Sequence, residues 1–201
     1  MTRDPRLPIV EDAHARLRMW RADAPGNCIF AAVAAIRAAR VRGRRLRLRA
    51  GTCFWPRRRD DGTDALFGFQ WEGTLAPAVQ DAVRRGKLPE VHVWADDPRR
   101  GDVVDLSTGG FRVLAARLGY VDWPAVPPPA WWWGPPTALP VGARYEPAGD
   151  ALAMVKAFLP DAFSMLPRGR ANGVAGTDAR VVSYGSRPPG VKICSMALHT
   201  K

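Results

Sequence analysis

One apolar stretch constrains the fold of this chain more than any other. Residues 28–40, CIFAAVAAIRAAR, are apolar on nearly every side of a helix before they turn basic. A turn-forming Ala-Pro-Gly-Asn precedes the stretch and Gly43 follows it, so the pattern predicts a helix with Asn27 as its N-cap and a stop near Gly43. A helix that is buried on nearly every face is normally the central helix of a domain.

The length and the apolar fraction allow one domain with a sizeable core, since 47% of the 201 residues are apolar. We predict a single domain over residues 1–160, with its core at about 20–120, and a loosely ordered C-terminal tail over 161–201. Residues 122–140, DWPAVPPPAWWWGPPTALP, contain too much proline for an interior helix or a central strand. They indicate an extended segment that packs over the domain or faces a ligand.

The net charge of +11 leaves two interpretations open. A basic chain can bind nucleic acid or an acidic protein, and residues 44–49, the arginines at 57–59 and exposed tryptophans at 131–133 would then form the surface. However, the basic residues are nearly all arginine, and a chain rich in Arg, Ala, Pro and Gly is also what a GC-rich coding sequence produces. The alternation of Arg and Leu over residues 44–54 is typical of a strand with one solvated face.

The cysteines and the N-terminus indicate a reducing compartment. Cys28, Cys53 and Cys194 are odd in number and form no CxxC, which argues against a disulfide scaffold and a zinc finger. The charged N-terminus has no apolar signal region, and no apolar run approaches the roughly 18 residues that span a bilayer. We therefore predict a cytoplasmic protein with no membrane contact, no metal and no cofactor.

Two short apolar runs around a polar turn carry the most informative polar residues. Residues 90–108 place His92 in the first run and Asp105 at the end of the second. A hairpin centred on residues 98–99 would set these two side chains opposite each other, within cross-strand reach. Asp96 and Asp97 compete for the same role, but they lie in the turn, where solvated carboxylates are common.

Cys28 completes a possible catalytic set. At the first turn of the predicted helix, unpaired N–H groups and the helix dipole favour a thiolate. Cys28 would be the nucleophile, His92 the base and acid, and Asp105 the group that orients the imidazole. The backbone N–H of Cys28 would meet the oxyanion, with Asn27 or Trp94 as a second donor. The competing interpretation is a core thiol, a satisfied strand histidine and a turn aspartate, and Cys53 is predicted to be a core or strand-end thiol.

The segments GNC, HVW and VVDLST resemble the transglutaminase-like branch of the papain-like cysteine enzymes, which has bacterial members. The resemblance covers about residues 20–120 and implies an α+β fold with the cysteine helix packed on an antiparallel sheet. It also implies a Cys28–His92–Asp105 triad, and the family's activities are peptide or amide hydrolysis and acyl transfer to amines. The Pro-Gly-Asn before the cysteine and the tryptophan segment depart from the shared pattern.

The sequence therefore predicts a cysteine-dependent amide or peptide hydrolase, or an acyltransferase, that acts through a Cys28 thioester. Its predicted partner is a peptide or amide substrate, with an acidic protein as a further candidate. Two alternatives remain open at this point: a basic module that binds nucleic acid or an acidic protein, and a catalytically inactive member of the same fold that only binds a partner.

Overall fold

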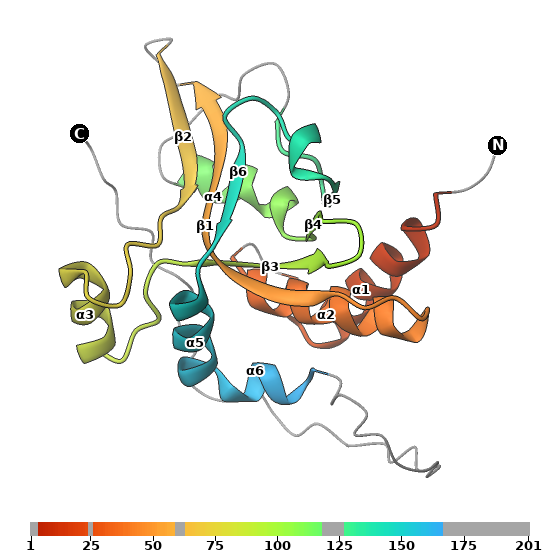
Figure 1. Cartoon of the computed structure of the whole chain (residues 1–201), viewed down its shortest axis with the longest axis horizontal. Coiled ribbons are helices and arrows are strands. Elements are labelled where there is room, and N and C mark those ends of the chain that lie inside the picture. The colour runs from red at the N-terminus through yellow and green to blue at the C-terminus, as the bar shows by residue number, and fades with distance from the viewer. Residues whose placement is uncertain (1–3, 24–25, 59–62, 118–126, 167–201) are drawn as a thin grey trace.

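The computed structural model describes residues 4–23, 26–58, 63–117 and 127–166, which form an α+β fold around a curled antiparallel sheet (Figure 1). The helices are α1 (Leu7–Met19), α2 (Cys28–Val41), α3 (Pro77–Arg84), α4 (Phe111–Arg117), α5 (Gly149–Phe158) and α6 (Pro160–Ser164). The strands are β1 (Arg47–Arg58), β2 (Asp64–Phe69), β3 (His92–Asp97), β4 (Asp102–Asp105), β5 (Trp132–Gly134) and β6 (Arg144–Pro147).

Strand β1 holds the sheet together because it pairs with three others. The strand order is β2-β1-β3-β4-β5, and β6 pairs with β1 as well. The first part of β1 pairs with β3, whereas the part from Cys53 onward pairs with β2. At Gly51 the strand pairs with both His92 and Pro147. A Cβ at Gly51 would lie 2.2 Å from the carbonyl oxygen of Glu146, so only glycine lets β6 approach this closely.

The pairing registers sort the side chains onto two faces, because directly opposed residues share a face. One face carries Ala50, Val93 and Ala95 and packs against the buried side of α2. The other carries Cys53 and Trp55, which pack with aromatic side chains of β2 and α4. The sheet is therefore covered on both faces from Gly51 onward, whereas the arginine side chains at the start of β1 lie on a partly solvated face, as the alternation predicted.

Helix α2 is the central helix, as predicted, and ten of its fourteen residues are buried. It begins at Cys28, and Gly43 follows its end with a positive φ of 70°. The alanines let α1 and β3 pack closely on it. Asn27 is the N-cap residue, as predicted, although its side chain makes no capping hydrogen bond.

The tryptophan segment contributes an edge strand and covers its rings to different degrees. Strand β5 pairs with β4 only, which agrees with the prediction that no central strand forms here. Trp133 is 4% exposed and packs with the α2 face, while Trp132 lies edge-on against Trp55 at 6.0 Å. Trp131 and Trp132 are half-buried and Trp133 is buried, so the prediction of three exposed tryptophans as a stacking surface was wrong.

The segment after Pro160 begins with a helix rather than an irregular tail. Helix α6 buries Ala162 beside α2 and α5. Residues 167–201, most of the predicted tail, lie outside the described residues, as do residues 118–126 at the start of the tryptophan segment. Among the described helices, none is long and apolar enough to cross a membrane.

Candidate active site

His92 opens β3 and is completely buried among aromatic rings. The ring of Phe69 stacks on the imidazole at 5.0 Å, and Trp94 lies nearly parallel to it at 6.0 Å. Phe111 meets it edge-on at 5.4 Å. Since imidazole has few rotameric choices inside such a cage, its two nitrogens point in fixed directions.

Asp105 ends β4 and is bound to this imidazole. Its Oδ2 lies 2.8 Å from Nε2 of His92, and both side chains are essentially inaccessible to solvent. The predicted hairpin register was wrong by two residues: Ala95 pairs with Val104, so the continued register puts Asp105 opposite Trp94 and diagonal to His92. The contact forms across the diagonal because residues two apart on a strand point to the same face.

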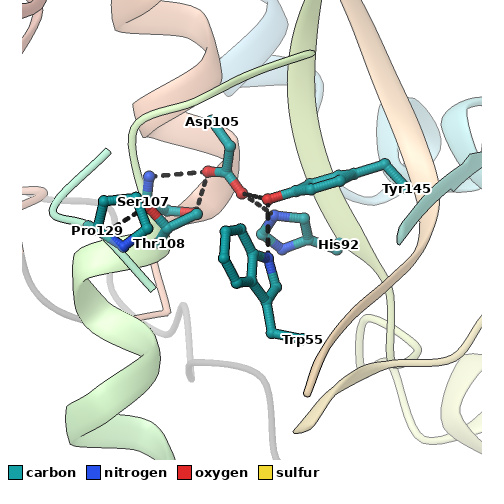
Figure 2. A network of polar contacts seen from close by, with 7 residues as sticks. All are labelled: Trp55, His92, Asp105, Ser107, Thr108, Pro129 and Tyr145. Carbon is teal, nitrogen blue, oxygen red and sulfur yellow. Dashed lines mark hydrogen bonds and ion pairs between the residues drawn. The ribbon is translucent and has the colours of Figure 1, made fainter. Parts of the chain in front are cut away.

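Three further donors surround the carboxylate, as Figure 2 shows. Oδ2 also accepts a hydrogen bond from the hydroxyl of Tyr145 at 2.8 Å. Oδ1 accepts from the backbone N–H of Ser107 at 2.8 Å and from its hydroxyl at 2.6 Å. Ser107 is the cap residue of the short 3-10 helix Thr108–Gly110, but its side chain makes no capping bond and binds Asp105 instead. A carboxylate that meets only donors is stable as the anion.

The two groups shift each other's pKa in opposite directions. Burial alone would raise the pKa of Asp105, but the charge of His92 and the bonds from His92 and Ser107 lower it overall. Burial alone would lower the pKa of His92, but the Asp105 carboxylate and the Cys28 sulfur raise it to about 10. At neutral pH the site therefore holds a buried imidazolium beside a buried carboxylate.

Cys28 meets the imidazole from the N-terminus of α2. Its side chain is 4% exposed, and its sulfur lies near enough to His92 to raise the pKa of the ring. Nε2 is taken by Asp105, while Nδ1 is buried and makes no hydrogen bond among the described residues. Nδ1 is thus the nitrogen left to exchange a proton with the thiol. The structure brings the three residues of the predicted triad together.

Cys53 lies in the same cluster, which the sequence did not indicate. It sits within β1 rather than at its end and is fully buried. One ligand atom from each of Cys53, His92 and Asp105 lies within 4.8 Å of the others. Burial and the nearby Asp105 carboxylate raise the pKa of the Cys53 thiol well above its usual value, so it remains neutral.

Cysteine, histidine and aspartate are also residue types that bind zinc. The distance between His92 and Asp105 tests whether this pair has the spacing of two zinc ligands. Two ligands of a tetrahedral zinc lie roughly 3.3 Å apart, given metal–ligand bonds of about 2.0–2.1 Å. The 2.8 Å between His92 and Asp105 is shorter and fits a shared proton. The geometry of this pair is therefore that of a hydrogen bond rather than of two metal ligands.

The competing aspartates have other roles. Asp96 pairs with Arg47 and Arg49, both of which reach its carboxylate from β1. Asp97 accepts a hydrogen bond from the backbone N–H of Arg99 and so closes the turn. The ion pairs of Asp96 also hold two arginine side chains of β1 against β3. Asp105 is therefore the carboxylate of the site.

The two predicted supporting residues differ in position. The Asn27 side chain is half-buried and lines a pocket of about 220 Å³, together with Gly26, Ser107 and Gly110. Asn27 directly precedes Cys28 in the chain, and Ser107 binds Asp105, so two neighbours of the site line this pocket. Trp94 is buried beneath His92 and packs against Tyr145 at 5.3 Å, so its evident role is to hold the imidazole.

Sequence reasoning missed Tyr145, Trp55 and the side-chain role of Ser107. Tyr145 lies forty residues beyond Asp105, on β6, which pairs with β1. Trp55 donates its indole N–H to the Tyr145 hydroxyl at 3.2 Å. No local spacing links these residues, although the short separation of Asp105 and Ser107 is typical of an Asx turn and could have revealed that bond.

No protein-family model, curated protein or solved structure matches the chain in the comparisons made.

Proposed function

We propose that this protein is a cysteine-dependent enzyme of the transglutaminase-like kind, which cleaves an amide or transfers its acyl group through a thioester on Cys28. One observation carries the proposal: His92 is held at Nε2 by a buried carboxylate while Nδ1 is left for a thiol at the start of a buried helix. The order Cys28, His92, Asp105 and the helix-on-sheet packing agree with that family.

The reaction would begin from a thiolate and an imidazolium. The Cys28 thiolate adds to the carbonyl carbon of the amide, and the protonated His92 gives its Nδ1 proton to the nitrogen as the C–N bond breaks. The acyl group then stays on sulfur. Water or an amine attacks the thioester, its proton passes to Nδ1, and the thiolate leaves, which restores the starting ion pair.

The start of α2 offers donors for the oxyanion. The first N–H groups of a helix have no acceptor within it, so the N–H of Cys28 is available to a carbonyl oxygen that approaches the sulfur. Asn27 is the second donor in this proposal, because its amide makes no capping bond and lines the adjoining pocket. Trp94 is the weaker candidate, since it packs beneath the imidazole.

The size of the pocket restricts what enters it. Pockets for small-molecule ligands usually measure about 300–1,000 Å³, and 220 Å³ is smaller. A single side chain or the end of a peptide fits this volume better than a larger compound. We therefore propose a peptide or a simple amide as the substrate; Asn27 and Ser107 line this pocket, whereas the triad residues are not among its lining residues.

Cys53 is the obvious rival nucleophile, and the structure gives reasons against it. Its thiol is fully buried within a strand and stays neutral, because burial raises its pKa. A neutral thiol is a poor nucleophile, and Cys53 has no helix N-terminus to stabilise a thiolate. Its closeness to Asp105 favours the protonated form further.

The test compares the two cysteines directly. We expect iodoacetamide at neutral pH to modify Cys28 faster than Cys53, as measured by mass spectrometry of the digested protein. The Cys28→Ala variant should keep the wild-type circular dichroism spectrum. It should lose the ability to form an acyl-enzyme with peptide and simple amide substrates. Cys53→Ala is the matched control and should retain the acyl-enzyme. Preferential labelling of Cys53, or an acyl-enzyme that survives Cys28→Ala, would overturn the proposal.

A further inference from the structure

We propose that Tyr145 and Trp55 are positioning residues that keep Asp105 a pure acceptor, so that His92 always gives its Nε2 proton to Asp105 and exchanges protons only through Nδ1. This inference rests on the proposed function for its catalytic meaning. The two residues do not touch the reacting atoms; they act through Asp105 and His92.

The direction of the hydrogen bonds follows from the indole. Trp55 Nε1 can only donate, and it lies 3.2 Å from the hydroxyl of Tyr145. That hydroxyl therefore accepts from Trp55 and turns its single proton toward Oδ2 of Asp105, 2.8 Å away. The chain of donors runs one way, from Trp55 through Tyr145 to the carboxylate (Figure 2).

The hydrogen bonds to Asp105 also determine the protonation of His92. Oδ1 of Asp105 meets two donors from Ser107, and Oδ2 already receives the Tyr145 proton. Asp105 therefore has no proton to offer, and the 2.8 Å contact with His92 requires Nε2 to be the donor. Nδ1 is the only ring nitrogen that can lose its proton and recover it during a reaction.

The fold keeps this arrangement in place. Tyr145 pairs with Cys53 across β6 and β1, and Trp55 lies two residues further along β1, so both rings share the face that carries His92. Burial and the Asp105 carboxylate raise the pKa of Tyr145 well above its usual value, so its hydroxyl stays protonated. The Tyr145 ring also packs on Trp94 and on His92, which a phenylalanine would still do.

The test uses the full chain and the variants Tyr145→Phe and Trp55→Phe. The first readout is the rate of Cys28 alkylation by iodoacetamide as a function of pH. Asp105 has to be ionised for the imidazolium to persist, and the titratable groups that face it are His92 on β3, Cys53 on β1 and Tyr145 on β6. In Tyr145→Phe the carboxylate has one donor fewer. The acid limb of the profile, where the alkylation rate of Cys28 falls at low pH, should therefore move up by about half to one pH unit.

The rate itself should fall as well. We expect alkylation of Cys28 at neutral pH to slow by about tenfold in Tyr145→Phe. Trp55→Phe should act in the same direction with a smaller effect, because the hydroxyl can still donate but is no longer held. Trp132→Phe is the matched control: its indole N–H makes no hydrogen bond among the described residues and its ring packs on Trp55. It should leave the pH profile unchanged.

The second readout does not depend on a reactive cysteine. The Nε2 proton of His92 should give a resolved downfield NMR resonance between pH 6 and 9 in the wild type, and this signal should broaden through solvent exchange in Tyr145→Phe. A wild-type profile and a sharp resonance in that variant would overturn the inference, and so would an equal effect of Trp132→Phe. If Cys28 is unreactive while the resonance still responds to Tyr145→Phe, the proposed function fails and the positioning role stands.

Discussion

Asp105 binds His92 across a diagonal of the sheet and not from the directly opposite position. Diagonal neighbours on paired strands have Cα atoms about 7–8 Å apart, a gap that an imidazole and a carboxylate can close together. A register error of two residues keeps both side chains on one face. An error of one residue would have turned the carboxylate toward α2 and separated the pair.

Removing the charge of Asp105 should disable the site. We expect Asp105→Asn to lower the rate of acyl-enzyme formation by roughly 10³- to 10⁴-fold, because an amide can offer a donor to Nε2 and so favours the wrong tautomer of His92. The variant should also lose about 3 kcal/mol of stability, since it leaves a buried imidazolium without its partner. Rapid-quench mass spectrometry measures the rate, and urea unfolding measures the stability.

Asp96→Asn is the matched control for that experiment. Asp96 lies on the neighbouring strand, but its carboxylate is partly exposed and pairs with Arg47 and Arg49. We expect it to cost about 1 kcal/mol or less, in a salt-dependent manner, and to leave acyl-enzyme formation unchanged. If Asp96→Asn abolished the reaction and Asp105→Asn did not, the carboxylate would be misassigned.

Stability should fall as the pH rises from about 6.5 toward 10. The folded-state pKa of His92 is raised from 6.5 to about 10, so its contribution is fully present below pH 6.5 and is lost as the pH approaches 10. The loss amounts to up to about 5 kcal/mol. Urea unfolding at a series of pH values measures it, and His92→Gln should flatten the curve over this range.

Asp105 produces the opposite dependence at acid pH. Its folded-state pKa is lowered from 3.8, so its contribution is present above that value and is lost as the pH falls below it. Stability should therefore be greatest between about pH 4 and 6.5, apart from the titration of other groups. A stability that rises steadily from pH 6.5 to 10 would contradict the buried imidazolium.

Gly51→Ala should displace the strand that carries Tyr145. Because a Cβ at this position would overlap the carbonyl of Glu146, β6 has to move away from β1. We expect a loss of about 2–4 kcal/mol and an acid limb of Cys28 alkylation that shifts in the same direction as in Tyr145→Phe. Gly86→Ala is the control: its Cβ position has open space and its φ of 64° adds backbone strain, so it should cost less than Gly51→Ala and leave the limb in place.

The aromatic cage should be needed for stability and for the site together. Phe111 is buried and lies against His92, Phe67 and Phe69. We expect Phe111→Ala to cost about 3–5 kcal/mol, because it leaves a cavity beside the imidazole. Thermal unfolding measures the loss. Phe111→Leu keeps most of the volume and should cost clearly less; equal losses would show that the ring does not pack as described.

Much of the site could be read from the sequence because its three main residues lie in local patterns. Cys28 follows a turn and opens an apolar helix, and His92 and Asp105 belong to one hairpin, so short-range periodicity was enough to select them. The register was wrong because a hairpin turn of ambiguous length leaves the pairing open by two residues. Local patterns also left the burial of the tryptophans undetermined, because long-range packing decides which rings are covered.

The sequence by itself determined the central helix and the hairpin, since each follows from the period and the breakers of a continuous segment. The antiparallel α+β architecture was expected only from the resemblance to a known family. Only the tertiary structure decided that Cys53, Trp55 and Tyr145 join the site. These side chains come from strands that β1 brings together across some ninety residues. The energy of such contacts depends on burial and on bond direction in three dimensions. Neither property produces a repeating pattern in the sequence.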